Sequence, residues 1–192
     1  MKKILFTRKL IKTSEDYASQ LFKVKFNIDD ELLTKEEIIT QSNDCDGIIS
    51  TVTEVFDNDI ISKLSKRIVI ISNFGVGFNN IDIKAAKKRN IIVTNTPDVL
   101  TEATAEIAIL IILGAARRAT EGIKYARNKN WRWSSDFLNG KELNQSNLGI
   151  LGMGRVGRAV AHRARSFGMK IHYYNRVRLS PDLEKDSVYH DS

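Results

Sequence analysis

Three glycines lie at the spacing of a phosphate-binding loop in the last third of the chain. The motif consists of Gly152, Met153, Gly154, Arg155, Val156 and Gly157. An apolar run at 147–151 precedes it, a helical pattern follows to about residue 167, and a second apolar run lies at 170–174. In this setting the first glycine permits a tight turn, the second lets a pyrophosphate approach the backbone, and the third allows close packing. Because free N–H groups at the helix start would hold the phosphates, the motif predicts dinucleotide binding.

The end of the second apolar run bears on which dinucleotide is bound. Enzymes that use NAD place an acidic residue there, which accepts hydrogen bonds from the ribose 2′-hydroxyl. This chain has Asn175 at that position, followed by Arg176 and Arg178. Their guanidinium groups could pair with a 2′-phosphate that a carboxylate would repel. NADP is therefore the preferred cofactor and NAD the alternative. The competing interpretation is that both arginines point into solvent.

A second pair of glycines lies nearer the start of the chain. Gly75 and Gly77 follow an apolar run and precede a helical pattern, but Asn80 occupies the third glycine position, which makes a poor dinucleotide motif. Exposed N–H groups in such a loop, at the carboxyl end of a strand, suit a smaller anion such as a substrate carboxylate. The alternative is a tight turn with a purely structural role.

Alternating strands and helices must position these loops. Short runs rich in Ile and Val predict strands at 3–7, 24–27, 47–51, 68–72 and 91–94. Helical patterns lie at 14–23, 34–41, 58–64 and 82–89; Thr34 with Glu37 predicts a capping box, and Asp57 a cap. The alternation predicts an α/β fold with a parallel sheet and helices on both faces. We expect the first hundred residues to form a flavodoxin-like unit.

The second half begins with helices. The segment 101–118 predicts a long helix that is apolar nearly all round, and so buried on most sides. A polar helix at 120–128 and an irregular stretch at 131–145 follow, before the strand that leads into the glycine motif. We therefore predict a domain boundary after residue 100.

The composition excludes several classes of protein. Hydrophobic residues make up 42% of the 192 residues and there are two prolines, which argues against disorder. The apolar stretch at 107–113 is too short to cross a membrane, and the first ten residues lack the apolar core of a signal peptide. The single cysteine, Cys45, cannot form an intramolecular disulfide. We therefore expect a cytoplasmic protein without a membrane partner.

The net charge of +7 is concentrated in one segment. Residues 115–178 contain 14 Lys plus Arg and three acidic residues. Such an excess is either a solvated face or the binding surface of an anion. The arginines gather at the glycine motif, its helix and the ribose position, where the phosphates of one cofactor account for them. With no recognised nucleic-acid motif present, we expect no nucleic-acid partner.

Three ordered motifs carry a resemblance to a known family. They are Asn73-Phe74-Gly75-Val76-Gly77-Phe78-Asn79-Asn80-Ile81-Asp82, Thr96-Pro97-Asp98-Val99-Leu100-Thr101 and the stretch 148–157 around the glycine motif. Together they resemble the D-isomer-specific 2-hydroxyacid dehydrogenases. Tyr173-Tyr174-Asn175-Arg176 and Trp131-Arg132-Trp133 are most similar to the glyoxylate and hydroxypyruvate reductase branch.

The resemblance implies an oxidoreductase that transfers a hydride between NAD(P) and a small 2-oxo or 2-hydroxy acid. Residues 1–100 would be the flavodoxin-like substrate domain, lacking its C-terminal return, and residues 101–192 the incomplete start of a Rossmann domain. The implied site residues are the following. Val76 and Gly77 would bind the substrate carboxylate through their backbone amides. Thr104 would lie near the nicotinamide, and Arg155 would lie at the pyrophosphate. Asn175, Arg176 and Arg178 would surround the ribose of the adenosine. Phe137 lies in a segment that crosses the dimer interface in some relatives, and a homodimer is expected for the full-length protein.

The catalytic residues of the family are not found in this sequence. By resemblance, a His as general acid and base, a Glu and an Arg come from a later part of a longer chain. His162, His172 and His190 do not fit the catalytic position. Residues 189–192 resemble the point where relatives begin the next helix, so we expect a truncated chain that is inactive alone. We also expect the second strand of the nucleotide domain to have an open outer edge. The alternative is a non-enzymatic, dinucleotide-sensing protein similar to the corepressors of this fold.

Overall fold

The computed structural model describes residues 1–128 and 132–192. Trp131, part of one motif in the resemblance, therefore lies outside the described residues. The chain divides into two compact units, Met1–Pro97 and Asp98–Ser192. The sequence predicted the division after residue 100. Within the described ranges, no helix is both long and apolar enough to cross a membrane.

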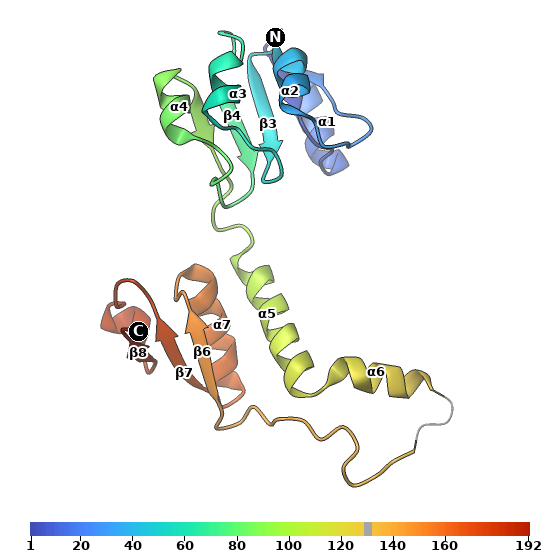
Figure 1. The fold of residues 1–192 in the computed structure, drawn as a ribbon, viewed down its shortest axis with the longest axis vertical. Helices are drawn as coiled ribbons and strands as arrows, with labels where there is room; N and C mark the ends of the chain where they lie inside the picture. The colour runs from blue at the N-terminus through green and yellow to red at the C-terminus, as the bar shows by residue number, and fades with distance from the viewer. Residues whose placement is uncertain (129–131) are drawn as a thin grey trace. The chain divides into compact units, whose positions relative to one another are not determined.

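The first unit is built on one parallel sheet (Figure 1). Its strands are β1 (Lys3–Phe6), β2 (Lys23–Lys25), β3 (Gly47–Thr51), β4 (Ile70–Phe74) and β5 (Ile92–Thr94). They lie in the order β2-β1-β3-β4-β5, and every pairing is parallel. This is the flavodoxin-like order, in which the strand order reverses between β1 and β3. The predicted α/β fold class is therefore confirmed.

Helices cover both faces of this sheet, but unequally. They are α1 (Lys12–Leu21), α2 (Lys35–Ser42), α3 (Asn58–Lys63) and α4 (Ile83–Lys88). Leu5, Ile48 and Ile71 form one core with α2, α3 and α4, whereas Ile4 and Phe6 face α1. On the face of α1, no helix of the described chain covers β5, where Ile92 is 61% exposed.

Local capping explains why α2 begins where it does. The N–H of Glu37 donates to Thr34 Oγ1 at 3.3 Å, and the N–H of Thr34 donates to Glu37 Oε2 at 2.8 Å. Two donors at the helix start are thus satisfied reciprocally, as the sequence predicted. Asp57 Oδ1 caps α3 in the same way, accepting the N–H of Ile60 at 3.0 Å.

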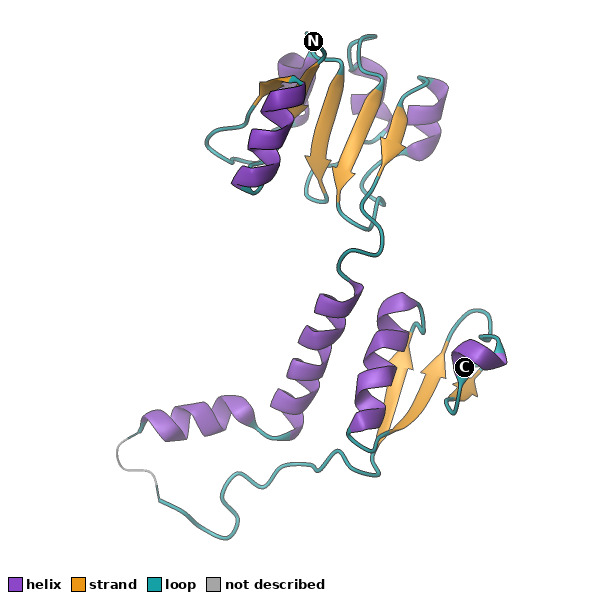
Figure 2. Cartoon of the chain, turned by 180° about the vertical axis from the view of Figure 1, so that it is seen from behind, coloured by secondary structure: helices purple, strands orange, loops and turns teal. Residues whose placement is uncertain are grey.

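The second unit contains a three-stranded parallel sheet (Figure 2). Its strands are β6 (Asn147–Leu151), β7 (Lys170–Tyr174) and β8 (Val188–His190), in that order. Its helices are α5 (Thr101–Ala116), α6 (Ala119–Arg127), α7 (Arg155–Ser166) and α8 (Pro181–Glu184). The core lies on one face of the sheet, where Met153, Ala161, Ile171 and Tyr173 are buried.

Two expectations about this unit were wrong. Residues 188–190 form strand β8, where the sequence predicted the start of a helix, so β7 has a neighbour on each side. Tyr189 explains the strand, because its ring packs into the core and its hydroxyl donates to the carbonyl of Asn175 at 3.2 Å.

Helix α5 is also less buried than predicted. Only Ala105 is buried, and Ile107, Leu110 and Ile111 are 56%, 63% and 64% exposed. The reason is that α5 packs on the core through one face alone, with Ile109, Ile112, Leu113 and Ala116.

Candidate functional site

The glycine loop joins β6 to α7 in the second unit. Gly152 has a φ of +98°, a conformation that side-chain-bearing residues rarely adopt. A Cβ on Gly157 would lie 2.3 Å from the carbonyl oxygen of Gly152, so only glycine lets the helix approach the strand this closely. A Cβ on Gly154 would meet nothing within 4 Å. The loop therefore needs its first glycine for the backbone conformation and its third for close packing, and it is open at its second.

The start of α7 fits an anionic group. Gly154 is the N-cap and has no side chain, so no side-chain cap satisfies the first N–H groups of the helix. The dipole of this twelve-residue helix adds partial positive charge there. The open space at Gly154 and the unsatisfied donors fit the pyrophosphate of a dinucleotide.

Asn175, the residue predicted to lie at the ribose, is hydrogen-bonded to this loop. Asn175 Oδ1 accepts the N–H of Met153 at 2.8 Å, and the N–H of Gly152 donates to the carbonyl of Tyr174 at 2.9 Å. The end of β7 is thereby fixed to the glycine loop. Because its oxygen is engaged, the amide of Asn175 keeps an N–H donor for a ligand, and it is uncharged, so it does not repel a phosphate.

The three arginines carried over from the sequence have different environments. Arg155 Nε lies 2.7 Å from Asp98 Oδ1, in an exposed ion pair of the kind that exchanges readily. Arg176 is exposed, and the described parts of the chain provide no ion-pair partner for it. Arg178 Nε donates to both oxygens of Glu184, each at 3.1 Å. Hydrogen bonding to this carboxylate raises the pKa of the Arg178 guanidinium, which therefore stays charged.

The remaining candidates are also placed by the structure. Thr104 is exposed on the first turn of α5. The ring of Phe137 packs edge-on against Tyr125, with centroids 5.1 Å apart. His172 Nδ1 and His190 Nε2 lie 2.9 Å apart on β7 and β8, and His162 lies on α7. Across residues 1–128 and 132–192, no group of three or more His, Cys, Asp or Glu could hold a metal ion.

The second glycine loop follows β4 in the first unit, and its carbonyl groups are held in place. Asn73 Nδ2 donates to the carbonyl of Gly77, and Asn95 Nδ2 to that of Val76, both at 2.8 Å. The carbonyl of Gly75 accepts the N–H of Thr96 at 3.0 Å. Asn73 is fully buried, so this scaffold is fixed from inside the unit.

The N–H groups of the same loop are left for a ligand. Within the described ranges, neither the N–H of Val76 nor that of Gly77 has an acceptor, and Gly77 is exposed. Asn80 supports the far end of the loop, donating to the carbonyls of Thr51 at 3.1 Å and Glu54 at 2.8 Å. Two adjacent donors on a fixed backbone are suited to a carboxylate.

The sequence did not predict the residues that hold these loops. Asn73 and Asn80 stood within a recognised motif, but nothing indicated that their amides support the backbone. A buried asparagine near the end of an apolar strand is the signal that could have identified Asn73, because such a side chain must find hydrogen-bond partners. Glu184 gave no comparable signal.

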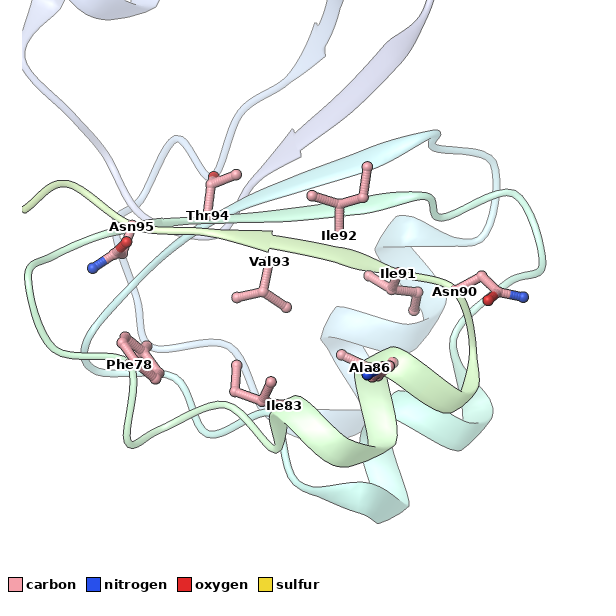
Figure 3. A pocket seen from close by; sticks show the side chains of 10 residues that line it. Phe78, Ile83, Ala86, Asn90, Ile91, Ile92, Val93, Thr94 and Asn95 are labelled. Carbon is pink, nitrogen blue, oxygen red and sulfur yellow. The ribbon is translucent and has the colours of Figure 1, made fainter.

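A separate apolar hollow of about 560 Å³ lies between β5 and α4. Figure 3 shows Ile91 and Val93 pointing toward Phe78, Ile83 and Ala86, with Ile92 and Thr94 on the opposite side of the strand. Val76 and Gly77 do not line it. The hollow is therefore distinct from the two donor N–H groups.

Comparison with known proteins gives consistent results. Residues 4–177 match the family of D-isomer specific 2-hydroxyacid dehydrogenases, catalytic domain. A glyoxylate reductase of Korarchaeum cryptofilum is 40% identical over 181 residues, which are 93% of this chain and 52% of that protein. A glycerate dehydrogenase of Hyphomicrobium methylovorum is 38% identical over 194 residues, covering 100% of this chain and 60% of that protein.

A solved structure shows the same fold. The Polaromonas sp. JS6 66 protein, assigned to the D-isomer specific 2-hydroxyacid dehydrogenases and described as NAD-binding, superposes with a TM-score of 0.92. It is 39% identical, and the match covers 100% of this chain and 60% of that one. The chain spans about half the length of the curated relatives it matches. The family match covers most of the chain, and the chain therefore belongs to the D-isomer specific 2-hydroxyacid dehydrogenase family.

Proposed function

We propose that this chain supplies the carboxylate-binding and dinucleotide-binding loops of an oxidoreductase that acts on a small 2-oxo or 2-hydroxy acid. Glyoxylate and hydroxypyruvate are the proposed substrates, and relatives named glyoxylate reductase and glycerate dehydrogenase support this choice. The nicotinamide, when bound, donates or accepts the hydride. The chain's own residues bind and orient the two reactants.

The observation that carries this proposal is the pair of unengaged N–H groups at Val76 and Gly77. The carbonyls of residues 75–77 all accept hydrogen bonds, from the side chains of Asn73 and Asn95 and the N–H of Thr96, so the loop cannot rotate its peptide planes without losing hydrogen bonds. Such donors are preorganised, and binding a carboxylate costs little further ordering. A 2-oxo acid would be held by its carboxylate with its carbonyl carbon exposed.

NADP is the proposed cofactor, with NAD as the alternative. An uncharged Asn175 replaces the acidic residue that would repel a 2′-phosphate, and Arg176 is exposed two residues beyond β7. Thr104, Gly152, Met153, Gly154, Arg155, Val156 and Gly157 complete the proposed dinucleotide site. The proposal extends to a cytoplasmic location, for which the free thiol of Cys45 is the support.

The carboxylate site can be tested by NMR. Titration of the ¹⁵N-labelled chain with glyoxylate should shift the amide resonances of Val76 and Gly77 first, because their N–H groups would donate to the ligand. The amide of Gly47, inside β3, is the internal control and should not move. Shifts confined to other residues would contradict the assignment of the loop.

The dinucleotide site can be tested by titration with NADPH and NADH, followed by ligand fluorescence. The variant Gly154→Ala places a methyl group in the open space in front of the loop. It should keep the melting temperature of the wild type and bind the cofactor at least about tenfold more weakly, a change of about 1.4 kcal/mol. Equal affinities in wild type and variant would contradict the proposed pyrophosphate position.

A further inference from the structure

The two arginines that follow β7 have different electrostatic environments. Arg178 donates from Nε to both oxygens of Glu184 at 3.1 Å, and its guanidinium carbon lies 5.7 Å from the ring centre of Tyr189. The positive charge of Arg178 is therefore compensated by a carboxylate in direct contact. A phosphate approaching this arginine would meet a neutral pair, with the negative charge of Glu184 beside it.

Glu184 is bound to the core and cannot follow Arg178 away from it. It is 6% exposed, and its Oε1 accepts the hydroxyl of Tyr173 at 3.2 Å. That hydroxyl in turn accepts the N–H of Leu179 at 3.1 Å. A buried carboxylate that lost its cation would be left uncompensated, so the network holds Arg178 in place.

Arg176 has the opposite situation. It follows Asn175, which two hydrogen bonds fix in place. The N–H of Met153 donates to the side-chain oxygen of Asn175, and the hydroxyl of Tyr189 donates to its backbone carbonyl. The side chain of Arg176 is exposed, and no carboxylate of the described residues neutralises it. Its full charge therefore extends from a rigid anchor at the ribose position.

We propose that Glu184 is a positioning residue: it neutralises Arg178 and so withholds this arginine from the 2′-phosphate, which leaves the selection of that group to Arg176. This inference rests on the proposed dinucleotide function and adds to it a division of roles between two neighbouring arginines. The preference for NADPH is then set by the free charge of Arg176, and it can be increased by releasing Arg178 from Glu184.

The test measures the dissociation constants of NADPH and NADH for the wild type and three variants. Arg176→Ala should weaken NADPH binding by about 10- to 100-fold, the range for a charge-assisted contact, and change NADH binding by less than about threefold. Glu184→Gln keeps the shape of the side chain and an acceptor for Tyr173. Because it releases Arg178, it should raise the NADPH preference several-fold above that of the wild type.

The double variant Arg178→Met with Glu184→Gln is the matched control. It removes the released cation and leaves no buried unpaired charge, so it remains a usable protein even if single changes at Arg178 unfold the loop. Its cofactor preference should return to the wild-type ratio. If Glu184 had only a structural role, Glu184→Gln would change the melting temperature and weaken the binding of both cofactors alike. The NADPH preference would then neither rise in Glu184→Gln nor return to the wild-type ratio in the double variant.

The possible failures are distinguishable. If Arg176→Ala keeps the NADPH preference, if Glu184→Gln does not raise it, or if the wild type binds both cofactors equally, the division of roles is wrong although the dinucleotide site stands. If the wild type binds neither cofactor, the proposed dinucleotide function itself is wrong.

Discussion

At the scale of single residues, the strongest electrostatic effect in the first unit belongs to Asp30. Its carboxylate accepts Arg8 Nε at 2.8 Å and Nη2 at 3.2 Å, and the N–H of Lys9 at 2.8 Å. These contacts, led by the guanidinium, lower the pKa of Asp30 to about 2. The residue also has a φ of 55°, which aspartate and asparagine tolerate better than most residues.

We expect Asp30→Asn to alter the pH dependence of stability. The unfolded chain has an aspartate pKa of about 3.9, so the charged form contributes stability that is fully present above about pH 4. This contribution is lost as the pH falls toward 2, through the pKa of the folded state. The wild type should therefore lose more free energy of unfolding between pH 5 and pH 2.5 than the variant does, as measured by urea unfolding. Parallel pH profiles would contradict the assigned pair, and asparagine controls for the backbone conformation.

Residues that bind through their own backbone could be predicted, whereas residues that support them could not. Val76 and Gly77 were identified from a local motif. Asn73 lies only 4 residues from its partner, and the burial of its amide was the signal that could have identified it. Asn95 lies 19 residues from its partner, and that contact exists only once β4 and β5 are paired. Local spacing carries no information about such contacts.

At the scale of elements, sequence pattern located the strands that apolar runs define. The expected strands at 147–151 and 170–174 agree with β6 and β7, and the capping box at Thr34 opens α2. Strand β8 was missed because its residues were assigned, by resemblance, to the start of the next helix. The burial of α5 was predicted wrongly because an apolar composition does not determine how many faces of a helix pack against other elements.

The packing of α7 on β6 leads to a prediction about Gly157. Alanine there would place its Cβ 2.3 Å from the carbonyl oxygen of Gly152, which is backbone and cannot rotate away. Gly157→Ala should therefore lower the free energy of unfolding of the second unit by about 1–3 kcal/mol, the usual cost of overpacking. Chemical denaturation of the variant gives the measurement.

Gly149→Ala is the control for that change. It lies on β6, and its Cβ would meet nothing within 4 Å. The loss of stability should be confined to Gly157→Ala; an equal loss in both variants would indicate a general effect of adding a methyl group rather than a close approach of helix and strand.

At the scale of the whole molecule, the exposed apolar face of α5 is a feature that solvent disfavours. Ile107, Leu110 and Ile111 project from one helix and are each more than half exposed. A contiguous patch of this kind favours association. We expect the chain to form a homodimer through this face; the family resemblance implied a homodimer of the full-length protein but not this interface.

Sedimentation velocity tests this expectation directly. The wild type should sediment as a dimer at micromolar concentration, and Leu110→Glu should shift it to monomer, because a charge on the face would be desolvated by the contact. Val99→Glu changes another exposed apolar side chain, just before the helix, and is the control, which should leave the dimer intact. A monomeric wild type would exclude the α5 dimer.

The last prediction concerns turnover, and it follows from where the titratable side chains lie. Reduction of a 2-oxo acid places negative charge on the former carbonyl oxygen, which needs a proton donor with a pKa near neutrality. His172 and His190 are hydrogen-bonded to each other at 2.9 Å on the second sheet, and His162 lies exposed on α7, so none of the three lies in either candidate loop. We therefore expect the chain to bind NADPH and yet not oxidise it when glyoxylate is added.

Both properties can be measured in one sample, by NADPH fluorescence for binding and by loss of absorbance at the reduced nicotinamide band for turnover. Binding without turnover is the expected result, and it separates the role of these loops from that of the proton donor. Turnover that survives in His162→Gln and His172→Gln would mean that another side chain donates the proton. Turnover abolished by one of these changes would place the donor on the second unit, and the assignment of that histidine would have to be revised.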